Sequence, residues 1–374
     1  MAGIYLHIPF CKQACHYCNF HFSTSLKLKN DFLTALLKEV DLRIDYTGND
    51  PIDTIYFGGG TPSILNTDEI LTILNKLSSR FNISTEAEIT LESNPDDISV
   101  SKLTDWKNAG INRLSIGVQS FYEEDLRWMN RAHTGTDALR SVKEALNTGF
   151  QNITIDLIYG TPHLTDEKWH FNVQQAIDLK IPHLSCYALT VEPKTPLESL
   201  ISKNKTPGVA AEDQARQFSL LMEWLQAAEY EHYEISNFAL PGKRSRHNSA
   251  YWMGKSYLGL GPSAHSFNGS SRQWNVANNS VYIQSIVKGE LPFEIEHLTP
   301  AQQLNEYIMT SLRTAEGVSI QIIRERSGAD TADKFDRRIS RFINEGLVEK
   351  NGQFYKLTKK GKLFADGIAA DLFV

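Results

Sequence analysis

The sequence predicts an α/β protein in which successive parallel strands form a partial or complete barrel, followed by a smaller C-terminal domain. Two observations lead to this fold class: short apolar segments alternate with longer amphipathic segments six times, and the chain is 374 residues long. Strands that alternate with helices pair in parallel, and at this length a barrel is favoured over a flat sheet. Ligands in such folds bind at the carboxyl ends of the strands, where most of the unusual polar residues of this chain stand.

Each predicted strand is a short apolar run, and each predicted helix has apolar residues at helical spacing. Thr67 and Ser99 are placed to cap the helices that they precede, while Gly110 and Gly149 are placed to end them. The strands are predicted at 4–8, 54–57, 87–92, 113–118, 152–159 and 183–189. The helices are predicted at 28–44, 67–81, 99–110, 137–149 and 166–179, with a further helix at 209–229 and a strand at 230–235.

The composition is that of an ordinary globular protein. Hydrophobic residues make up 41% of the chain and charged residues 22%, and the net charge of -6 does not favour bulk binding of nucleic acid. No apolar run is long enough to span a bilayer and no signal peptide is recognisable, so we predict a cytosolic location. Three of the four cysteines fall within residues 11–18, which is not a disulfide framework, and Cys186 is predicted to pack in the core.

The amino-acid composition changes after the segment with the barrel pattern. Residues 235–289 contain no Asp or Glu but six Lys or Arg, among several histidines and aromatic residues. The stretch is either a solvated basic loop or a site for an anionic ligand. We therefore divide the chain into a barrel over 1–235, a basic connecting region over 236–296 and a C-terminal domain over 297–374.

The end of the chain is typical of a winged-helix unit, because two strands flank an Asn-Gly turn and a helix follows. Winged helices often bind DNA. Here an interaction or lid role is at least as well supported, since the Lys-rich wing is short and no separate basic recognition helix is evident.

The opening cysteines carry the strongest chemical signal. Cys11, Cys15 and Cys18 follow the first strand with the spacing CxxxCxxC. Three thiolates can ligate three irons of a cubane cluster and leave the fourth iron open. Zinc is the alternative metal, but a structural zinc site normally has four protein ligands, and His16 and His21 lack the usual paired spacing.

The second strand ends in YFGGGTPS, residues 56–63. Three glycines there allow the backbone to approach a ligand closely, and the pattern is neither GxGxxG nor a Walker loop. Glu92, Gln119 and Asp156 lie on or at the ends of the following strands. Each could satisfy loop amides alone, but together they ring the mouth of one barrel.

The motifs YLHIPFCKQACHYC, GGGTPS, LESNPDD, SIGVQSF, LRWMNRAHT and IDLIYGTP together resemble the radical S-adenosylmethionine superfamily, in its coproporphyrinogen III oxidase-like branch. They run in order over residues 4–162. The resemblance implies a partial (β/α)6 barrel of the TIM type, a helical C-terminal domain, and a 4Fe–4S cluster on Cys11, Cys15 and Cys18. It also implies S-adenosylmethionine as cofactor, with contacts from Tyr5, Tyr17, Gly59, Gly60, Thr61, Glu92, Gln119, Arg131 and Asp156.

Two functions compete within this branch. One is the oxygen-independent coproporphyrinogen III oxidase (dehydrogenase), which decarboxylates propionate side chains; the other is a heme chaperone, which binds and delivers heme. Oxidases carry a further cysteine where this chain has Phe20, and a long N-terminal extension where only ten residues precede Cys11. Residues 246–252, RHNSAYW, match the HNxxYW signature of the chaperones. The resemblance therefore favours the chaperone, and oxidase activity is not expected.

The signature also has a physical interpretation. His247 can supply an axial nitrogen to heme iron, Tyr251 and Trp252 offer flat faces to a porphyrin, and nearby Arg and Lys residues can pair with its propionates. Alternatively, His247 and Asn248 cap a loop while the aromatic rings fill the core, and His265 or a tyrosine could ligate the iron instead. The partners implied are heme and hemoprotein acceptors, with membrane-associated respiratory enzymes among them, and no nucleic acid. The oligomeric state, a homodimer included, stays open.

Overall fold

The structure is a computed structural model that describes residues 2–48 and 50–374. It confirms the predicted barrel: six parallel strands follow one another in sequence order, and all six predicted strands are present. Side chains alternate across each strand, so in β1 Ile4, Leu6 and Ile8 are wholly buried under the outer helices while Tyr5 and His7 point into the barrel. The strands are β1 (Ala2–Ile8), β2 (Ile52–Gly59), β3 (Ile83–Ser93), β4 (Arg113–Gln119), β5 (Ile153–Tyr159) and β6 (His183–Ala188).

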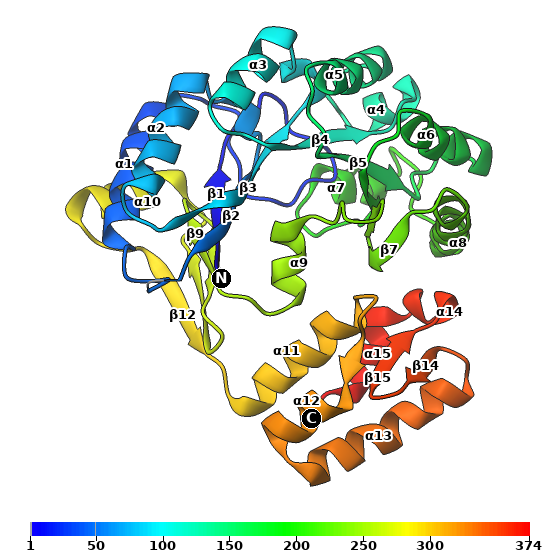
Figure 1. Ribbon diagram of the computed structural model, residues 1–374. Helices are drawn as coiled ribbons and strands as arrows, with labels where there is room; N and C mark the ends of the chain where they lie inside the picture. The colour runs from blue at the N-terminus through cyan, green and yellow to red at the C-terminus, as the bar shows by residue number, and fades with distance from the viewer. Residues whose placement is uncertain (1, 49) are drawn as a thin grey trace.

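Helices cover the outer side of this curved sheet (Figure 1). Their apolar stripes pack on the outward side chains of the strands and form one large hydrophobic core, in which Cys186 is buried as predicted. The predicted helices are all present. They are α1 (Lys29–Leu42), α2 (Thr67–Ser78), α3 (Val100–Asn108), α5 (Gly135–Asn147), α6 (Asp166–Asp178) and α8 (Ala211–Ala227), with α4 (Glu123–Trp128) and α7 (Pro196–Ser202) in addition.

The predicted helix caps are right with one exception. Ser99 accepts the backbone N–H of Lys102 at the start of α3, and Gly110 and Gly149 follow helix ends with positive φ. The cap of α2 is Asn66 rather than Thr67. Asn66 and Glu69 form a reciprocal capping box, which satisfies two backbone donors where Thr67 would satisfy one.

Residues 231–297, which include the connecting region 236–296, extend the barrel sheet at both ends. β7 (Glu231–Glu234) and β8 (Asn237–Ala239) add antiparallel strands beside β6, while β9 (Tyr257–Leu260) pairs in parallel with β1. β10 (His265–Phe267), β11 (Ser271–Asn275) and β12 (Phe293–His297) continue the sheet beyond β9. Two helices complete the region: α10 (Asn279–Lys288) packs beside α1, and α9 (Arg246–Trp252) lies on the inner side of the sheet (Figure 1).

The C-terminal segment has its own hydrophobic core, which runs from Leu304 to Leu372. Its three-stranded sheet pairs β13 (Val318–Ser319), β15 (Phe354–Leu357) and β14 (Val348–Asn351), and the last two flank the predicted Asn-Gly turn. The helices are α11 (Pro300–Leu312), α12 (Ile320–Ser327), α13 (Ala329–Asn344), α14 (Lys359–Lys362) and α15 (Ala365–Leu372). This segment contacts the β7 edge of the large sheet through backbone hydrogen bonds such as that from Ala315 to Tyr233 (3.0 Å).

Within the described residues, no helix combines the length and the apolar character needed to cross a membrane.

Candidate functional site

The three clustered cysteines lie on one loop that follows β1 at the carboxyl end of the barrel. Backbone hydrogen bonds fix the base of the loop: Cys11 N–H donates to the Ser23 carbonyl (3.0 Å), and Ser23 N–H donates to the Pro9 carbonyl (2.9 Å). Within the loop, Cys18 N–H donates to the Cys15 carbonyl (3.3 Å). All three cysteines are free thiols of intermediate exposure.

Polar groups from the barrel reach two of these thiols. Thr61 Oγ1 donates to Cys11 Sγ (3.4 Å), and Arg131 Nη1 donates to Cys15 Sγ (3.3 Å). Burial raises the pKa of Cys11 to about 11 and also raises the pKa of Cys18. Thiolates on this loop therefore need compensating positive charge, which Arg131 and a metal centre can supply.

The donor set can be tested against the two candidate metals. Among residues 2–48 and 50–374, no three His, Cys, Asp or Glu side chains converge closely enough to hold one metal ion. A structural zinc site normally has four protein ligands, and this loop offers three cysteines. A cubane cluster makes a different demand, because each thiolate binds its own iron and the sulfurs do not meet at one point. Three free thiols on one loop fit that demand.

Arg131 joins the cysteine loop to two barrel strands. Its Nη2 donates to Asn94 Oδ1 (2.7 Å), just after β3, and to the Gly117 carbonyl of β4 (2.8 Å). Its Nε is buried and has no hydrogen-bond partner. Tyr17, on the same loop, packs against the small hydrophobic cluster that includes Met129. Arg131 therefore keeps one N–H donor without a partner beside the thiols, and this donor can bind an anionic group.

The glycine-rich loop is shaped by close contact with the chain around β1. Gly59 has φ +106° and packs on the His7 ring, and a Cβ on Gly60 would stand 2.6 Å from the Phe10 carbonyl oxygen. Backbone N–H groups of Gly60 and Thr61 donate to the carbonyls of Ile8 and Phe10 (2.9 and 2.7 Å). These glycines are thus required to seat the cysteine loop, in addition to any approach to a ligand.

Carboxyl groups project into the barrel from β3 and β5. Tyr56 donates to Glu92 Oε1 (2.8 Å) and its ring stacks on that of Tyr5, with centroids 6.1 Å apart. Burial raises the pKa of Glu92 to about 8 and that of Asp156 to about 6. Glu92 is therefore largely protonated at neutral pH, and the pair can donate as well as accept hydrogen bonds from a ligand.

A polar cavity of about 50 Å³ lies between these carboxyl groups and α9, which is enough for a few water molecules. Arg113 borders it and keeps a buried Nε without a partner. The cavity is lined by Tyr56, Glu92, Arg113, Ser115, Thr154, Asp156, Ser185, Tyr187, Ser245 and Asn248.

Gln119 ends β4 in a left-handed conformation (φ 65°), a strained backbone state of the kind that clusters at functional sites. The point where a Cβ of Gly117 would stand is 3.0 Å from Gln119 Nε2, 3.2 Å from Arg131 Nη2 and 3.6 Å from Asn94 Oδ1. The structure thus brings these side chains together. Sequence reasoning missed Asn94 and Tyr56 as site residues; a period-two count forward from Glu92 would have found Asn94.

α9 lies at the opposite, amino-terminal end of the barrel. The His247 ring bonds Thr54 Oγ1 through Nδ1 (2.7 Å) and Tyr251 OH through Nε2 (2.8 Å), and it stacks on Tyr56 at 4.9 Å. The backbone N–H groups of Arg246 and His247 both donate to the Glu88 carboxylate. Burial lowers the pKa of His247 to about 3, and only 2% of the residue is exposed. His247 is therefore a neutral, fully bonded side chain that fastens α9 to the barrel.

The other members of the signature have separate environments. Asn248 borders the polar cavity. The Tyr251 ring stands edge-on to that of Tyr257 (4.5 Å), and the Arg313 guanidinium lies over the Trp252 ring (5.2 Å). α9 therefore touches the barrel interior, β9 and the C-terminal segment.

Half of the basic residues in the acid-free stretch are neutralised by carboxylates from elsewhere. Arg244 pairs with Glu231 and Glu316, Arg272 with Glu306, and Arg246 with Asp53 at 4.0 Å. Among the residues that the structure describes, Lys243, Lys255 and Lys288 have no ion pair.

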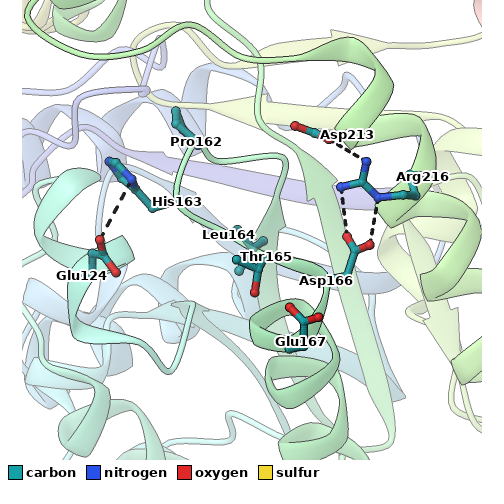
Figure 2. A pocket seen from close by; sticks show the side chains of 9 residues that line it. All are labelled: Glu124, Pro162, His163, Leu164, Thr165, Asp166, Glu167, Asp213 and Arg216. Atoms are coloured by element: carbon teal, nitrogen blue, oxygen red, sulfur yellow. Dashed lines mark hydrogen bonds and ion pairs between the residues drawn. The ribbon is translucent and has the colours of Figure 1, made fainter.

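A larger groove of about 480 Å³ lies outside the barrel, near the start of α6 (Figure 2). Several of its charged groups pair with one another: Arg216 binds Asp166 (2.8 Å) and Asp213 (2.7 Å), and His163 lies 4.0 Å from Glu124.

Comparison with known families agrees with this geometry. Residues 5–173 match the model of the radical SAM superfamily, and residues 298–364 match the HemN C-terminal domain. The superfamily match covers the cysteine loop and the parallel strands from β1 to β5, and it ends before β6.

Named relatives resemble the chain along nearly its whole length. The heme chaperone HemW of Bacillus subtilis is 34% identical over 98% of this chain and 98% of its own. The HemW proteins of Mycobacterium tuberculosis and Escherichia coli are each 32% identical, over 99% and 98% of this chain and 94% and 96% of theirs. Among solved structures, the coproporphyrinogen III oxidase HemN of Escherichia coli matches 100% of this chain and 90% of its own, with a TM-score of 0.87 and 24% identity. The last likeness shows the fold.

Proposed function

This chain belongs to the HemW family of the radical SAM superfamily, and we propose that it binds heme and passes it to hemoprotein acceptors. The observation that carries the proposal is the similarity to heme chaperones along almost the entire chain. Phe20 supports it further, because oxidases of this branch are expected to carry cysteine at that position. Phe20 is 68% exposed beside the cysteine loop.

We also propose that Cys11, Cys15 and Cys18 hold a 4Fe–4S cluster and that S-adenosylmethionine binds at the same end of the barrel. Such a cluster supplies one electron to the sulfonium group of its cofactor. The unsatisfied Nε of Arg131 is suited to a cofactor carboxylate. Buried Glu92 and Asp156 are suited to its hydroxyl or amino groups. The remaining proposed contacts are Tyr5, Tyr17, Gly59, Gly60, Thr61 and Gln119.

For heme, we propose contacts from Asn248, Tyr251 and Trp252 of α9. Trp252 is partly exposed and presents an apolar face, which suits a porphyrin. His247 was the first candidate for the iron ligand. For His247 to serve, the bond from one of its ring nitrogens to Thr54 or Tyr251 must break, and the ring must leave its stack on Tyr56.

The acceptors that we propose are hemoproteins, membrane-associated respiratory enzymes among them. We place the protein in the cytosol because three cysteines crowded into residues 11–18 do not form a disulfide framework, and a reducing compartment would keep them available as thiolate ligands.

The proposal is tested by titrating the purified chain with ferric heme and then adding an apo-hemoprotein. We expect stoichiometric binding with a Soret band, followed by transfer of the heme. Trp252→Leu should weaken binding, while Trp224→Leu on the outer helix α8 should not. In a parallel anaerobic assay with reconstituted cluster, coproporphyrinogen should remain unconverted. Absence of heme binding, or conversion of coproporphyrinogen with cofactor consumption, would overturn the chaperone assignment.

A further inference from the structure

The inner face of the barrel sheet continues beyond β1 onto β9, β10 and β11. Gly3 of β1 pairs with Tyr257, Tyr257 pairs with Phe267, and Phe267 pairs with Arg272. Paired residues point to the same side of a sheet, and so do residues two apart along a strand. His265 and Trp274, which pair with each other, therefore share the face that forms the barrel interior.

The opposite face is already occupied. Ser266, between His265 and Phe267, accepts a hydrogen bond from the Arg43 guanidinium at the end of α1 (3.2 Å). Helix α1 thus packs on the outer side at β9 and β10. The inner side carries partly exposed rings instead: Tyr257, Phe267 and Trp274 are each of intermediate exposure. We call this set, together with His265, the aromatic face.

His265 differs from the other histidines near the barrel interior. It is exposed, and its ring takes part in no hydrogen bond or ion pair within the described residues. His247 and His183 use both ring nitrogens in hydrogen bonds, and His7 does the same with Tyr5 and His21.

The His265 imidazole is also held in the form that a metal needs. Partial burial, followed by the nearby charge of Arg272, lowers the pKa of His265 below its ordinary value. The ring is therefore neutral at physiological pH and keeps a nitrogen lone pair. The Trp274 ring stands beside it, with centroids 6.2 Å apart at an interplanar angle of 30°.

We propose that His265 is an axial ligand of the heme iron and that the porphyrin lies on the aromatic face, against Trp274 and Phe267, next to Tyr251 of α9, whose ring adjoins that of Tyr257 (4.5 Å). The inference rests on the proposed heme binding and assigns its metal ligand. A flat, largely apolar iron porphyrin matches two features found together here: a free imidazole and partly exposed rings on one side of a sheet.

The experiment is a titration of the full chain with ferric heme, read by the Soret band, by electron paramagnetic resonance of the iron and by the dissociation constant. We expect His265→Ala to raise the dissociation constant at least tenfold and to remove the imidazole signature of the iron. Free imidazole added to that variant should restore the signature. The matched control is His297→Ala, an exposed histidine of β12 that pairs with buried Ser271 on the outer face.

The outcomes separate this inference from the function on which it rests. If the unaltered chain binds no heme, the proposed function fails. If it binds heme but His265→Ala leaves both affinity and iron spectrum unchanged, the ligand assignment fails alone. Loss of the imidazole signature in His297→Ala would likewise overturn it. Trp274→Leu gives a second check, because it should weaken binding while the imidazole signature persists.

Discussion

Replacing His247 with alanine should weaken the attachment of α9 to the amino-terminal end of the barrel and so lower the free energy of unfolding. His247 is the one side chain of α9 that bonds β2 through its ring while its backbone N–H binds Glu88 of β3. The alanine variant removes both ring hydrogen bonds and the stack on Tyr56. It therefore tests whether the HNxxYW signature fastens the fold, as its geometry indicates.

The magnitude follows from the groups left behind. Thr54 and Tyr251 would each keep a buried hydroxyl without its partner, at a cost of about 1–3 kcal/mol apiece. Loss of the aromatic contact with Tyr56 adds about 1 kcal/mol. These contributions sum to about 3–7 kcal/mol, and we expect the free energy of unfolding to fall by about 4 kcal/mol, in the lower half of that range. Thr54→Val keeps the shape of the pocket and removes one hydroxyl, so it should cost about 1–2 kcal/mol.

Urea unfolding followed by tryptophan fluorescence measures this change mainly in the barrel, because all six tryptophans precede residue 297. Trp252 also contacts the C-terminal segment, through Arg313. With a slope of about 3 kcal/mol per molar urea, the His247→Ala midpoint should fall by about 1.3 M. His297→Ala, an exposed control on β12, should stay within about 0.5 kcal/mol of the unaltered chain. A His247→Ala midpoint equal to that of the control would refute the structural role.

Three further predictions concern the other end of the barrel. Because burial raises the pKa of Glu92 to about 8 from an ordinary 4.5, the folded chain holds a proton that the unfolded chain releases, and stability falls as pH rises through that window. Glu92→Gln should flatten the fall in urea midpoint between about pH 5 and pH 8, and equal slopes would contradict it. Gly60→Ala should push the cysteine loop aside and lower iron incorporation after anaerobic reconstitution, whereas Gly367→Ala, where a Cβ meets no atom within 4 Å, should not; equal iron content would count against the packing argument. Cys18→Ser should lose cluster iron and Cys186→Ser should retain it, since Cys186 is buried in the core; iron retained in the first variant would remove Cys18 from the ligand set.

The barrel strands were predictable because each carries its own signal. A run such as IYLHI is apolar enough to be buried under a helix, and its period-two alternation separates Ile4 and Leu6 from Tyr5. The strands β8 to β11 escaped prediction. They are three to five residues long and hold polar residues such as Asn237 and Ser271, so their pairing with distant strands, rather than local propensity, makes them strands.

The candidate site likewise combines features that a local pattern predicts with contacts that depend on distant parts of the chain. The sequence predicted the CxxxCxxC and GGGTPS motifs as site features, because metal ligation and tight turns require particular residues at fixed spacing. The sequence alone could not show that Gly60 seats the cysteine loop or that Asn94 meets Arg131, because these contacts join separate strands.

The RHNSAYW motif shows most clearly what a local sequence pattern can and cannot predict. The sequence by itself determined the six βα units, the cysteine triad and the resemblance to a family, because these depend on short-range patterns. Only the tertiary structure decided which histidines near the barrel interior have unbonded rings. His247 stands in the motif, yet Thr54 and Tyr251 occupy both of its nitrogens, whereas His265, outside the motif, keeps an unbonded ring on an exposed aromatic face. The availability of a nitrogen lone pair depends on neighbours brought from elsewhere in the chain, which a local pattern does not specify.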